Sequence, residues 1–324
     1  MRIGIQGAGK LGGVVALAFE SKGHDVLVTD KAEWVQQAFA NKKWPHRERG
    51  VPELMEKTKI RCVPLSELVK HSEIIFVAVQ TPHEPQYGGA VPLPADRKDF
   101  DYTHLKAAVK ELREVIGNKP TDFTIPVIAV ISTVLPGTMR REILPLLSMI
   151  SGIVIPFVYC PFFAAMGTVV EDVLDPEFVL MGTDANCVED CPEWEAFRFL
   201  ASLSDHKKPG AVLSIESAEL IKVGYNCAIT QKIVLANALM EIAHKVPGCD
   251  VEDVTDVLKR ATDRIVSPRY MDAGVGDGGG CHPRDGIAMS WLCDELNISR
   301  TANPFENAMQ AREMQACWLV DLFL

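Results

Sequence analysis

The chain opens with the stretch RIGIQGAGKLG, residues 2–12. Apolar residues prone to form a strand come first, a glycine-rich turn follows, and an apolar run typical of a buried helix continues from residue 13. A strand, a tight turn and a helix in this order are the beginning of a parallel βαβ unit. The opening stretch therefore predicts a doubly wound α/β fold.

Within this stretch, Gly7, Gly9 and Gly12 form the pattern G-x-G-x-x-G. The first glycine permits the tight turn, the second lets the backbone approach a pyrophosphate, and the third lets the helix pack closely on the strand. Lys10 and Leu11 lie between them, where the helix N-terminus can stabilise phosphate charge. A lone glycine pattern can arise by chance, but here the predicted strand and helix flank it, so these five residues are expected to bind a dinucleotide.

Asp30 ends the second predicted strand, 18 residues beyond Gly12. A carboxylate in this position accepts hydrogen bonds from the adenosine ribose and repels a 2′-phosphate. NAD is therefore the predicted cofactor, in preference to NADP.

Short apolar runs alternate with helical stretches along the first part of the chain and predict strands in a parallel sheet. The predicted strands are residues 2–6, 26–29, 60–63, 74–79, 127–131, 153–159 and 178–181. Residues 217–245 then read as one long helix without proline, and further helices are expected at 251–260, 284–297 and 305–324. We expect an NAD-binding Rossmann domain over residues 1–205 and an all-helical domain, with one long central helix, over residues 206–324.

Composition argues against several classes of partner. The formal charge of −10 and the dispersed basic residues argue against nucleic acid, and no apolar run approaches the length that spans a membrane. Nine cysteines without a C-x-x-C pair favour a reducing cytoplasm. The eight histidines show no metal-ligand spacing, so no metal is expected.

Four further motifs carry a family resemblance. They are VQTP at residues 79–82, STVLPGT at 132–138, SAELIK at 217–222 with Asn226 after it, and GGGCHPRD at 278–285. Their order and spacing resemble the UDP-glucose/GDP-mannose dehydrogenase family, the nucleotide-sugar 6-dehydrogenases, along the whole of residues 1–324. The resemblance implies that an alcohol carbon is oxidised twice by NAD while a cysteine holds the aldehyde and then a thioester, which water releases as the acid.

Cys281 is the candidate nucleophile. It lies in a glycine-rich loop just before a predicted helix, where exposed amides and the helix dipole can lower the pKa of a thiol. An inert buried thiol is the alternative. Asp285 resembles the aspartate that the family places beside its catalytic lysine and thiol.

Lys222 and Asn226 are four residues apart on one predicted helix and project from the same face. Both can donate hydrogen bonds to a single developing oxyanion. Spacing alone fits a solvated charge and a surface amide equally well, and the resemblance favours the catalytic roles.

The resemblance assigns roles to four more residues. Thr81 is expected to contact the cofactor, while Ser132 and Thr133 lie where a strand ends and can hydrogen-bond the nicotinamide side or a catalytic water. Arg264 matches an arginine that reaches a substrate across a dimer interface, although an arginine between helices is often simply solvated.

The chain departs from the family at the segment N-P-E-F-L-x-E-G, which here reads CPFFAAMG at residues 160–167. Phe162 and Met166, both expected at the substrate, replace two glutamates. The first glutamate is linked to acid–base work in thioester hydrolysis, so Phe162 is expected to slow release of the acid. The resemblance also implies a further domain that binds the nucleotide of the sugar, and we expect that residues 1–324 do not include it.

Three functions remain open at this stage. The first is oxidation of the primary alcohol of a nucleotide sugar to the acid. The second is a related NAD-dependent reaction that uses another hydroxylated substrate or stops before hydrolysis. The third is a non-catalytic NAD-binding protein. In each case we expect a homodimer built on helix 217–245.

Overall fold

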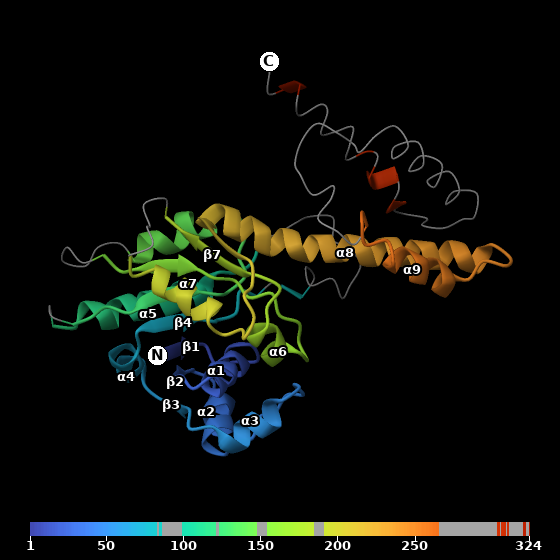
Figure 1. Ribbon diagram of the computed structural model, residues 1–324. Coiled ribbons are helices and arrows are strands. Elements are labelled where there is room, and N and C mark those ends of the chain that lie inside the picture. Colours follow the sequence, from blue (N-terminus) through green and yellow to red (C-terminus); the bar gives the residue numbers. More distant parts are fainter. Residues whose placement is uncertain are drawn as a thin grey trace. The chain divides into compact units, whose positions relative to one another are not determined.

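The computed structural model describes residues 1–82, 84–85, 99–120, 123–147, 154–184 and 191–265, together with 303–304, 306–308, 310, 320–321 and 324. The chain forms two compact units, Met1–Tyr225 and Asn226–Leu324. The first unit contains the sheet, and the second is described mainly by helices (Figure 1).

The first unit is built on one eight-stranded sheet of order β3-β2-β1-β4-β5-β6-β7-β8. Its strands are β1 (Arg2–Gln6), β2 (Asp25–Thr29), β3 (Arg61–Cys62), β4 (Ile74–Val77), β5 (Val127–Val130), β6 (Phe157–Tyr159), β7 (Val179–Thr183) and β8 (Gly210–Ser214). Neighbouring strands are parallel except β6 and β7. The strand order reverses between β1 and β4, and ligands of doubly wound sheets bind beside such a reversal at the carboxyl ends of the strands.

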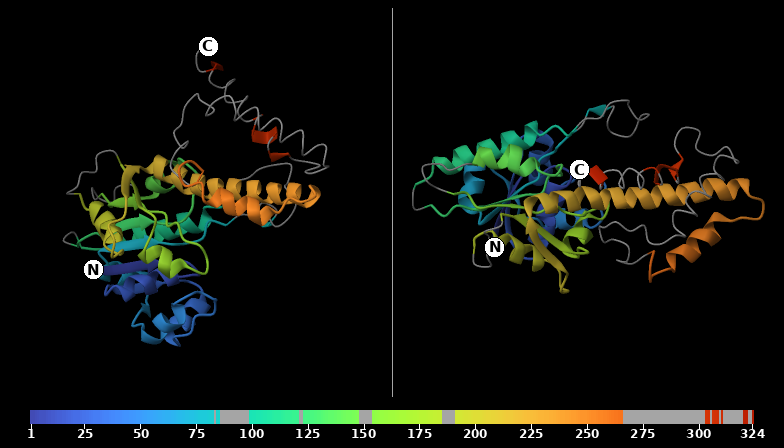
Figure 2. Two further views of the ribbon diagram at one scale, coloured as in Figure 1. Left: turned by 45° about the vertical axis from the view of Figure 1, so that its right-hand side comes forward. Right: turned by 90° about the horizontal axis from the view of Figure 1, so that it is seen from above.

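Helices cover both faces of this sheet, as can be followed in Figure 2. One face packs against α1 (Gly12–Ser21), α2 (Glu33–Ala40), α3 (Val51–Lys57), α6 (Val169–Leu174) and α7 (Trp194–Ala201). The other packs against α4 (Leu65–His71), α5 (Thr103–Gly117), the short helices η2 (Met139–Ile143) and η3 (Leu144–Leu147), and the first turns of α8 (Ile215–Lys245).

Strand β4 shows why the central strands read as continuous apolar runs. Ile74 and Phe76 belong to the core on the α1 side, whereas Ile75 and Val77 belong to the core on the α5 side. All four side chains are fully buried because successive residues of a strand point to opposite faces. The predicted α/β class with a mainly parallel sheet is therefore confirmed.

Differences from the predicted strands have local causes. The strand expected at 153–159 is described only as Phe157–Tyr159, and Pro156 directly before it lacks the N–H needed to continue the ladder. The strand expected at 74–79 ends at Val77, at the carboxyl edge of the sheet. β8 was not predicted, because Gly210–Ser214 is a partly exposed edge strand without a strong apolar pattern.

In the second unit, α8 continues as far as Lys245 and α9 spans Val251–Lys259. Asp250 caps α9 by accepting a hydrogen bond from the N–H of Glu252 at 2.8 Å. The helix predicted at 251–260 is thus present as α9. The helix expected at 284–297, the glycine loop before it and most of the helix expected at 305–324 lie outside the described residues.

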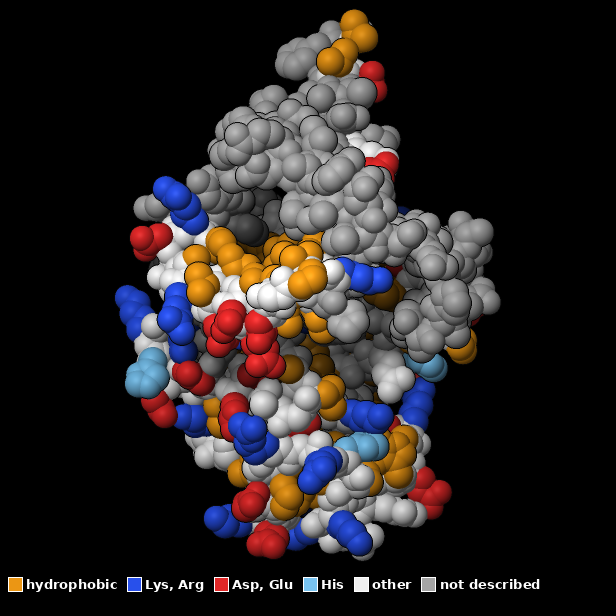
Figure 3. All heavy atoms as spheres, turned by 90° about the vertical axis from the view of Figure 1, so that its right-hand side faces the viewer, with side chains coloured by type: hydrophobic (Ala, Val, Ile, Leu, Met, Phe, Trp, Pro, Cys, Tyr) orange, Lys and Arg blue, Asp and Glu red, His pale blue; other side chains and the backbone are white. Residues whose placement is uncertain are grey.

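Two surface properties bear on possible partners. None of the helices in the described part of the chain has the length and apolar character needed to cross a membrane. On the face drawn in Figure 3, the described Lys and Arg side chains lie interspersed with Asp and Glu.

Candidate functional site

The turn between β1 and α1 requires glycine at its first position. Gly7 has a φ of +93°, and its N–H donates to the carbonyl of Thr29 at 2.9 Å. A Cβ added here would lie 2.9 Å from the backbone carbonyl carbon of Ala78. The turn therefore fits between β2 and the end of β4 only without a side chain.

The other two glycines of the motif differ in what surrounds them. A Cβ on Gly12 would lie 2.1 Å from the carbonyl oxygen of Gly7, so this position allows α1 to pack against the turn. At Gly9, by contrast, no described atom lies within 4 Å of an added Cβ. The open space at Gly9 is the cradle that a pyrophosphate needs.

The start of α1 can receive an anion. Lys10 is exposed and Leu11 half-buried at this point, and no described side chain caps the helix N-terminus. The first N–H groups of a helix lack partners within the helix, and the helix dipole favours negative charge there. This arrangement fits phosphate binding beside the space at Gly9.

A cavity of about 500 Å³ opens beside this turn. Its walls come from the β1–α1 turn, the ends of β2 and β4, and helices α2 and α5. They include Gln6, Gly7, Gly9, Thr29, Asp30, Lys31, Trp34, Val79, His104, Ala108 and Glu111. A volume in this range is typical of cofactor sites.

Asp30 lies on the wall of this cavity at the end of β2. Its Oδ1 accepts a hydrogen bond from the N–H of Ala32 at 2.8 Å, which fixes the carboxylate at the start of the next helix. Lys31 and Glu111 form an ion pair on the same wall. Together with the space at Gly9, this carboxylate fits the adenosine end of NAD.

Sequence reasoning missed Trp34, which lines the cavity from the first turn of α2. Its indole contacts Trp44 and His46, with ring centroids 5.6 and 5.2 Å away, and it remains 37% exposed.

The loops that follow β4 and β5 are joined by two side-chain hydrogen bonds. The hydroxyl of Ser132 donates to the carbonyl of Val79 at 2.6 Å, and the hydroxyl of Thr81 donates to the carbonyl of Thr133 at 2.7 Å. The structure thus brings together Thr81, Ser132 and Thr133 at the carboxyl edge of the sheet.

Lys222 lies on α8 and is only 8% exposed. Its Nζ donates a hydrogen bond to the carbonyl of Phe162 at 2.8 Å and lies 4.9 Å from the centre of the Phe163 ring. Burial lowers the pKa of this ammonium group. A solvated surface charge, the alternative suggested by spacing alone, does not describe Lys222.

The side chain of Phe162 points away from Lys222. Its ring packs in the core against Phe19 and Phe76, with centroids 6.3 Å away in each case. Met166, at the other position where the family has glutamate, is 60% exposed.

The end of this segment is held by Glu48, another residue that sequence reasoning missed. Its carboxylate is 6% exposed and accepts hydrogen bonds from the N–H groups of Gly167 and Val169, both at 2.8 Å. Glu48 therefore fixes residues 167–169 at the start of α6. Its position in a polar loop offers no local signal for this role.

The remaining predicted residues are not assembled into one site by the described structure. Asn226 lies one turn after Lys222 on α8 and is exposed, and Arg264 lies exposed in the turn after α9. Cys281 and Asp285 lie outside the described residues. Among the residues that are described, no group of three or more His, Cys, Asp or Glu side chains is arranged to hold a metal ion.

Known protein families match both parts of the chain. Residues 1–194 match the NAD binding domain of the UDP-glucose/GDP-mannose dehydrogenase family, and residues 216–312 match its central domain. The GDP-mannose 6-dehydrogenase of Pseudomonas savastanoi pv. phaseolicola is 28% identical over 308 residues, which cover 92% of this chain and 65% of that protein. UDP-glucose 6-dehydrogenase 1 of Arabidopsis thaliana is 26% identical, over 95% of this chain and 62% of its own length.

Solved structures agree with these matches. A ternary complex of GDP-mannose dehydrogenase from Pseudomonas aeruginosa has a TM-score of 0.86 at 25% identity and covers all of this chain and 71% of its own. A UDP-glucose dehydrogenase from Pyrobaculum islandicum shares the fold, with a TM-score of 0.68 at 22% identity.

The chain spans less than two thirds of the length of the curated relatives named above. The two family matches nevertheless cover most of its residues in the expected order. The chain therefore belongs to the UDP-glucose/GDP-mannose dehydrogenase family, and its first unit carries that family's NAD binding domain.

Proposed function

We propose that this protein is an NAD-dependent dehydrogenase that oxidises the primary alcohol of a nucleotide sugar to the acid, with Cys281 as covalent nucleophile. Its relatives are named as GDP-mannose and UDP-glucose 6-dehydrogenases. The observation that carries the proposal is the burial of Lys222, whose ammonium group is enclosed by the carbonyl of Phe162 and the ring of Phe163. A charge kept in such a place is suited to act on a developing negative charge.

The proposed reaction has three stages. Bound NAD would supply the hydride acceptor for each of two oxidations, the first of which converts the alcohol, with loss of its hydroxyl proton, to an aldehyde. The Cys281 thiolate then forms a C–S bond with the aldehyde carbon, and the second oxidation leaves a thioester. Water breaks the C–S bond, which releases the acid, a proton and the free thiolate.

Each remaining site residue has a proposed task in these stages. Lys222 and Asn226 stabilise the oxyanion that develops when the thiolate adds, and the low local dielectric strengthens the effect of Lys222. Asp285 is proposed to assist the Cys281 thiol, and Thr133 to orient the nicotinamide side or the water. Arg264 contacts the substrate.

The cofactor is held by the first unit. The space at Gly9 and the N-terminus of α1 receive the pyrophosphate, with Lys10 and Leu11 in the same turn, and Asp30 binds the adenosine ribose. Thr81 contacts the cofactor from the loop after β4, and Ser132 binds its nicotinamide side at the carboxyl edge of the sheet.

A second candidate is supported by the position of Phe162, whose ring lies in the core and supplies no acid–base group near Lys222. General acid–base groups contribute about 10²–10⁴-fold to a rate. Without such a group at position 162, the protein is expected to accumulate the thioester, or to use a substrate for which hydrolysis is not required. The exposed Met166 would then shape the substrate pocket, whereas the ring of Phe162, expected at the substrate, lies in the core instead.

The test uses the purified protein with NAD and a panel of nucleotide sugars that includes GDP-mannose and UDP-glucose. NADH is followed by absorbance while intact mass reports a covalent adduct, in wild type, in Cys281→Ala and in Cys249→Ala, whose thiol is exposed and free. Two NADH per sugar in wild type and in Cys249→Ala, but not in Cys281→Ala, are expected. A stoichiometric adduct with little turnover supports the second candidate, whereas NAD binding without any reaction across the panel would leave a non-catalytic NAD-binding protein.

We also propose a homodimer built on α8. Apolar side chains on this helix are exposed, namely Leu220, Leu235 and Met240, and exposed apolar surface of this kind often marks an interface. Light scattering across a concentration series tests the proposal, and a mass equal to one chain at all concentrations rules it out.

A further inference from the structure

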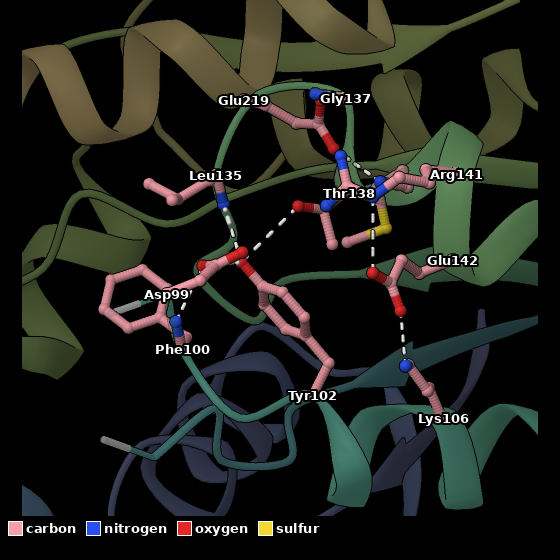
Figure 4. A network of polar contacts seen from close by, with 11 residues as sticks. Asp99, Phe100, Tyr102, Lys106, Leu135, Gly137, Thr138, Arg141, Glu142 and Glu219 are labelled. Carbon is pink, nitrogen blue, oxygen red and sulfur yellow. Dashed lines mark hydrogen bonds and ion pairs between the residues drawn. The ribbon is translucent and has the colours of Figure 1, made fainter. Parts of the chain in front are cut away.

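Glu219 is a fully buried carboxylate on α8, three residues before Lys222. Both of its oxygens accept hydrogen bonds from one backbone segment. Oε2 accepts from the N–H of Gly137, and Oε1 accepts from the N–H of Met139 at 2.7 Å (Figure 4). The side chain therefore joins α8 to the loop that follows β5.

This loop, residues 131–138, begins at the carboxyl edge of the sheet. Near its start are Ser132 and Thr133, which form the hydrogen bonds to the β4 loop. At its end, Gly137 adopts a φ of +84°, which turns the two N–H groups toward Glu219. Glu219 thus holds one end of the segment whose other end faces the proposed nicotinamide position.

A second tether holds the middle of the same loop. The hydroxyl of Tyr102, just before α5, accepts a hydrogen bond from the N–H of Leu135 at 3.2 Å and contacts the hydroxyl of Thr138 at 3.4 Å. It donates in turn to Asp99 at 2.6 Å. Figure 4 shows Tyr102 and Glu219 approaching the loop from different elements.

The chemistry of this position favours a carboxylate over an amide. Two converging N–H donors need two acceptors, and glutamine offers one acceptor oxygen and one NH₂ donor. Turned either way, glutamine would place its NH₂ against an N–H and leave a buried donor without a partner. Burial of a carboxylate is costly and raises the pKa of Glu219, so a carboxylate at this position is expected to have a specific role.

We propose that Glu219 is a positioning residue for the nicotinamide half of NAD. It fixes the loop that carries Ser132 and Thr133 against the first turns of α8, which carry Lys222. The inference rests on the placement of Ser132 and Thr133 beside the nicotinamide in the proposed function, but it requires no sugar substrate.

The experiment compares two ligands that differ only at that half. NADH contains the reduced nicotinamide, whereas ADP-ribose lacks it and retains the pyrophosphate and adenosine. Calorimetric affinities for both are measured in wild type, in Glu219→Gln and in Glu216→Gln. Glu216 lies one turn earlier on α8 and pairs with Arg140 at the surface, so it controls for loss of a carboxylate on this helix.

Glu219→Gln is expected to weaken NADH binding about tenfold, equivalent to ~1.4 kcal/mol, and to leave ADP-ribose binding within about twofold of wild type. Glu216→Gln is expected to change neither affinity. If Glu219→Gln still binds ADP-ribose but both affinities fall by the same factor, the role is a general structural one and the proposal is overturned, as it would be by wild-type affinity for NADH.

Binding of ADP-ribose also reports whether Glu219→Gln folds. If that variant binds neither ligand, Tyr102→Phe provides the second test, because it keeps the ring and removes the other tether of the same loop. A selective loss of NADH affinity supports the proposal, and unchanged affinity for both ligands overturns it. Failure of every sugar in the oxidation panel would refute the proposed function, whereas this comparison would still decide the role of Glu219.

Discussion

The ammonium group of Lys222 donates its hydrogen bond to the backbone carbonyl of Phe162, not to a carboxylate, at 2.8 Å. The same residue that supplies this carbonyl directs its ring into the core of the first unit. Among the residues that the structure describes, this neutral acceptor holds the charge in place without neutralising it. Lys222 can therefore act electrostatically on a substrate. Removal of its charge should lower the rate of the reaction more than the stability of the fold.

Replacement of Lys222 by methionine tests this role. Lys222→Met keeps the length of the side chain and removes the charge, so turnover should fall by about 10²–10³, the usual cost of losing one oxyanion donor. Affinity for NAD should stay near that of wild type. Lys245→Met, at the exposed end of the same helix, should retain full activity. Equal turnover in the two variants would contradict an electrostatic role.

The lowered pKa of Lys222 predicts a pH dependence of stability. Between this lowered pKa and the ordinary lysine value of 10.5, the unfolded chain binds more protons than the folded one. The free energy of unfolding contributed by Lys222 therefore rises with pH across this window and is constant below it. Urea titrations at a series of pH values should show wild type gaining stability relative to Lys222→Met as the pH rises. If the free energies of unfolding of the two proteins change with pH in parallel, Lys222 is not desolvated.

Phe162→Glu tests the consequence of the missing carboxylate. The charged side chain has to leave the contacts with Phe19 and Phe76, so we expect the free energy of unfolding to fall by about 1–3 kcal/mol. If a carboxylate beside Lys222 assists thioester hydrolysis, the adduct on Cys281 should disappear faster in single-turnover mass measurements. Phe162→Leu is the control, because it weakens the packing without adding an acid. Equal adduct lifetimes in the two variants would show that hydrolysis does not depend on this position.

Two glycines of the first turn should respond differently to alanine. Gly9→Ala adds a methyl group where no described atom lies within 4 Å, so the melting temperature should hardly change while NAD affinity drops as the pyrophosphate is displaced. Gly12→Ala places the methyl group 2.1 Å from the carbonyl oxygen of Gly7 and should destabilise the whole unit. Thermal melts and NADH titrations of both variants separate the two effects. A strongly destabilised Gly9→Ala protein would contradict the open cradle.

Asp30→Asn addresses the preference for NAD. Loss of the negative charge removes repulsion of a 2′-phosphate and weakens the hold on the ribose hydroxyls, so the ratio of NADPH to NADH affinity should rise about tenfold or more. Asp25→Asn, at the opposite end of β2, should leave the ratio as in wild type. Fluorescence titration with both reduced cofactors measures the ratio. An unchanged ratio in Asp30→Asn would mean that discrimination between NADH and NADPH resides elsewhere on the cavity wall.

The central strands could be predicted from the sequence because both faces of the sheet are covered. Residues 74–77 are apolar without interruption, and such a run has few interpretations other than a buried strand. β8 could not be predicted because it is only partly buried and because its pairing partner, β7, is distant in sequence. Its existence is decided by tertiary contact and not by local pattern.

The candidate site likewise contains residues that could be predicted from the sequence and residues that could not. The glycine turn and Asp30 could be identified from local spacing, since each has a geometric task within one βαβ unit. The environment of Lys222 could not, because its partner Phe162 is 60 residues away and contributes a backbone atom. The roles of Glu48 and Glu219 could not be predicted for the same reason, although Glu219 lies within the motif at residues 217–222. Both bind backbone N–H groups of remote loops, and the sequence does not show which loops these are.

The place of β8 and of the first turns of α8 in the sheet unit has a consequence during synthesis. Ile215 and Ala218 complete a core that β4 and α5 begin, and a Cβ on Gly182 of β7 would touch Ala218 at 2.8 Å. Until these residues leave the ribosome, the nascent chain carries an unpaired edge at β7 and an open apolar face. Slow translation before residue 210 would prolong an aggregation-prone stage, in which chaperones are most needed.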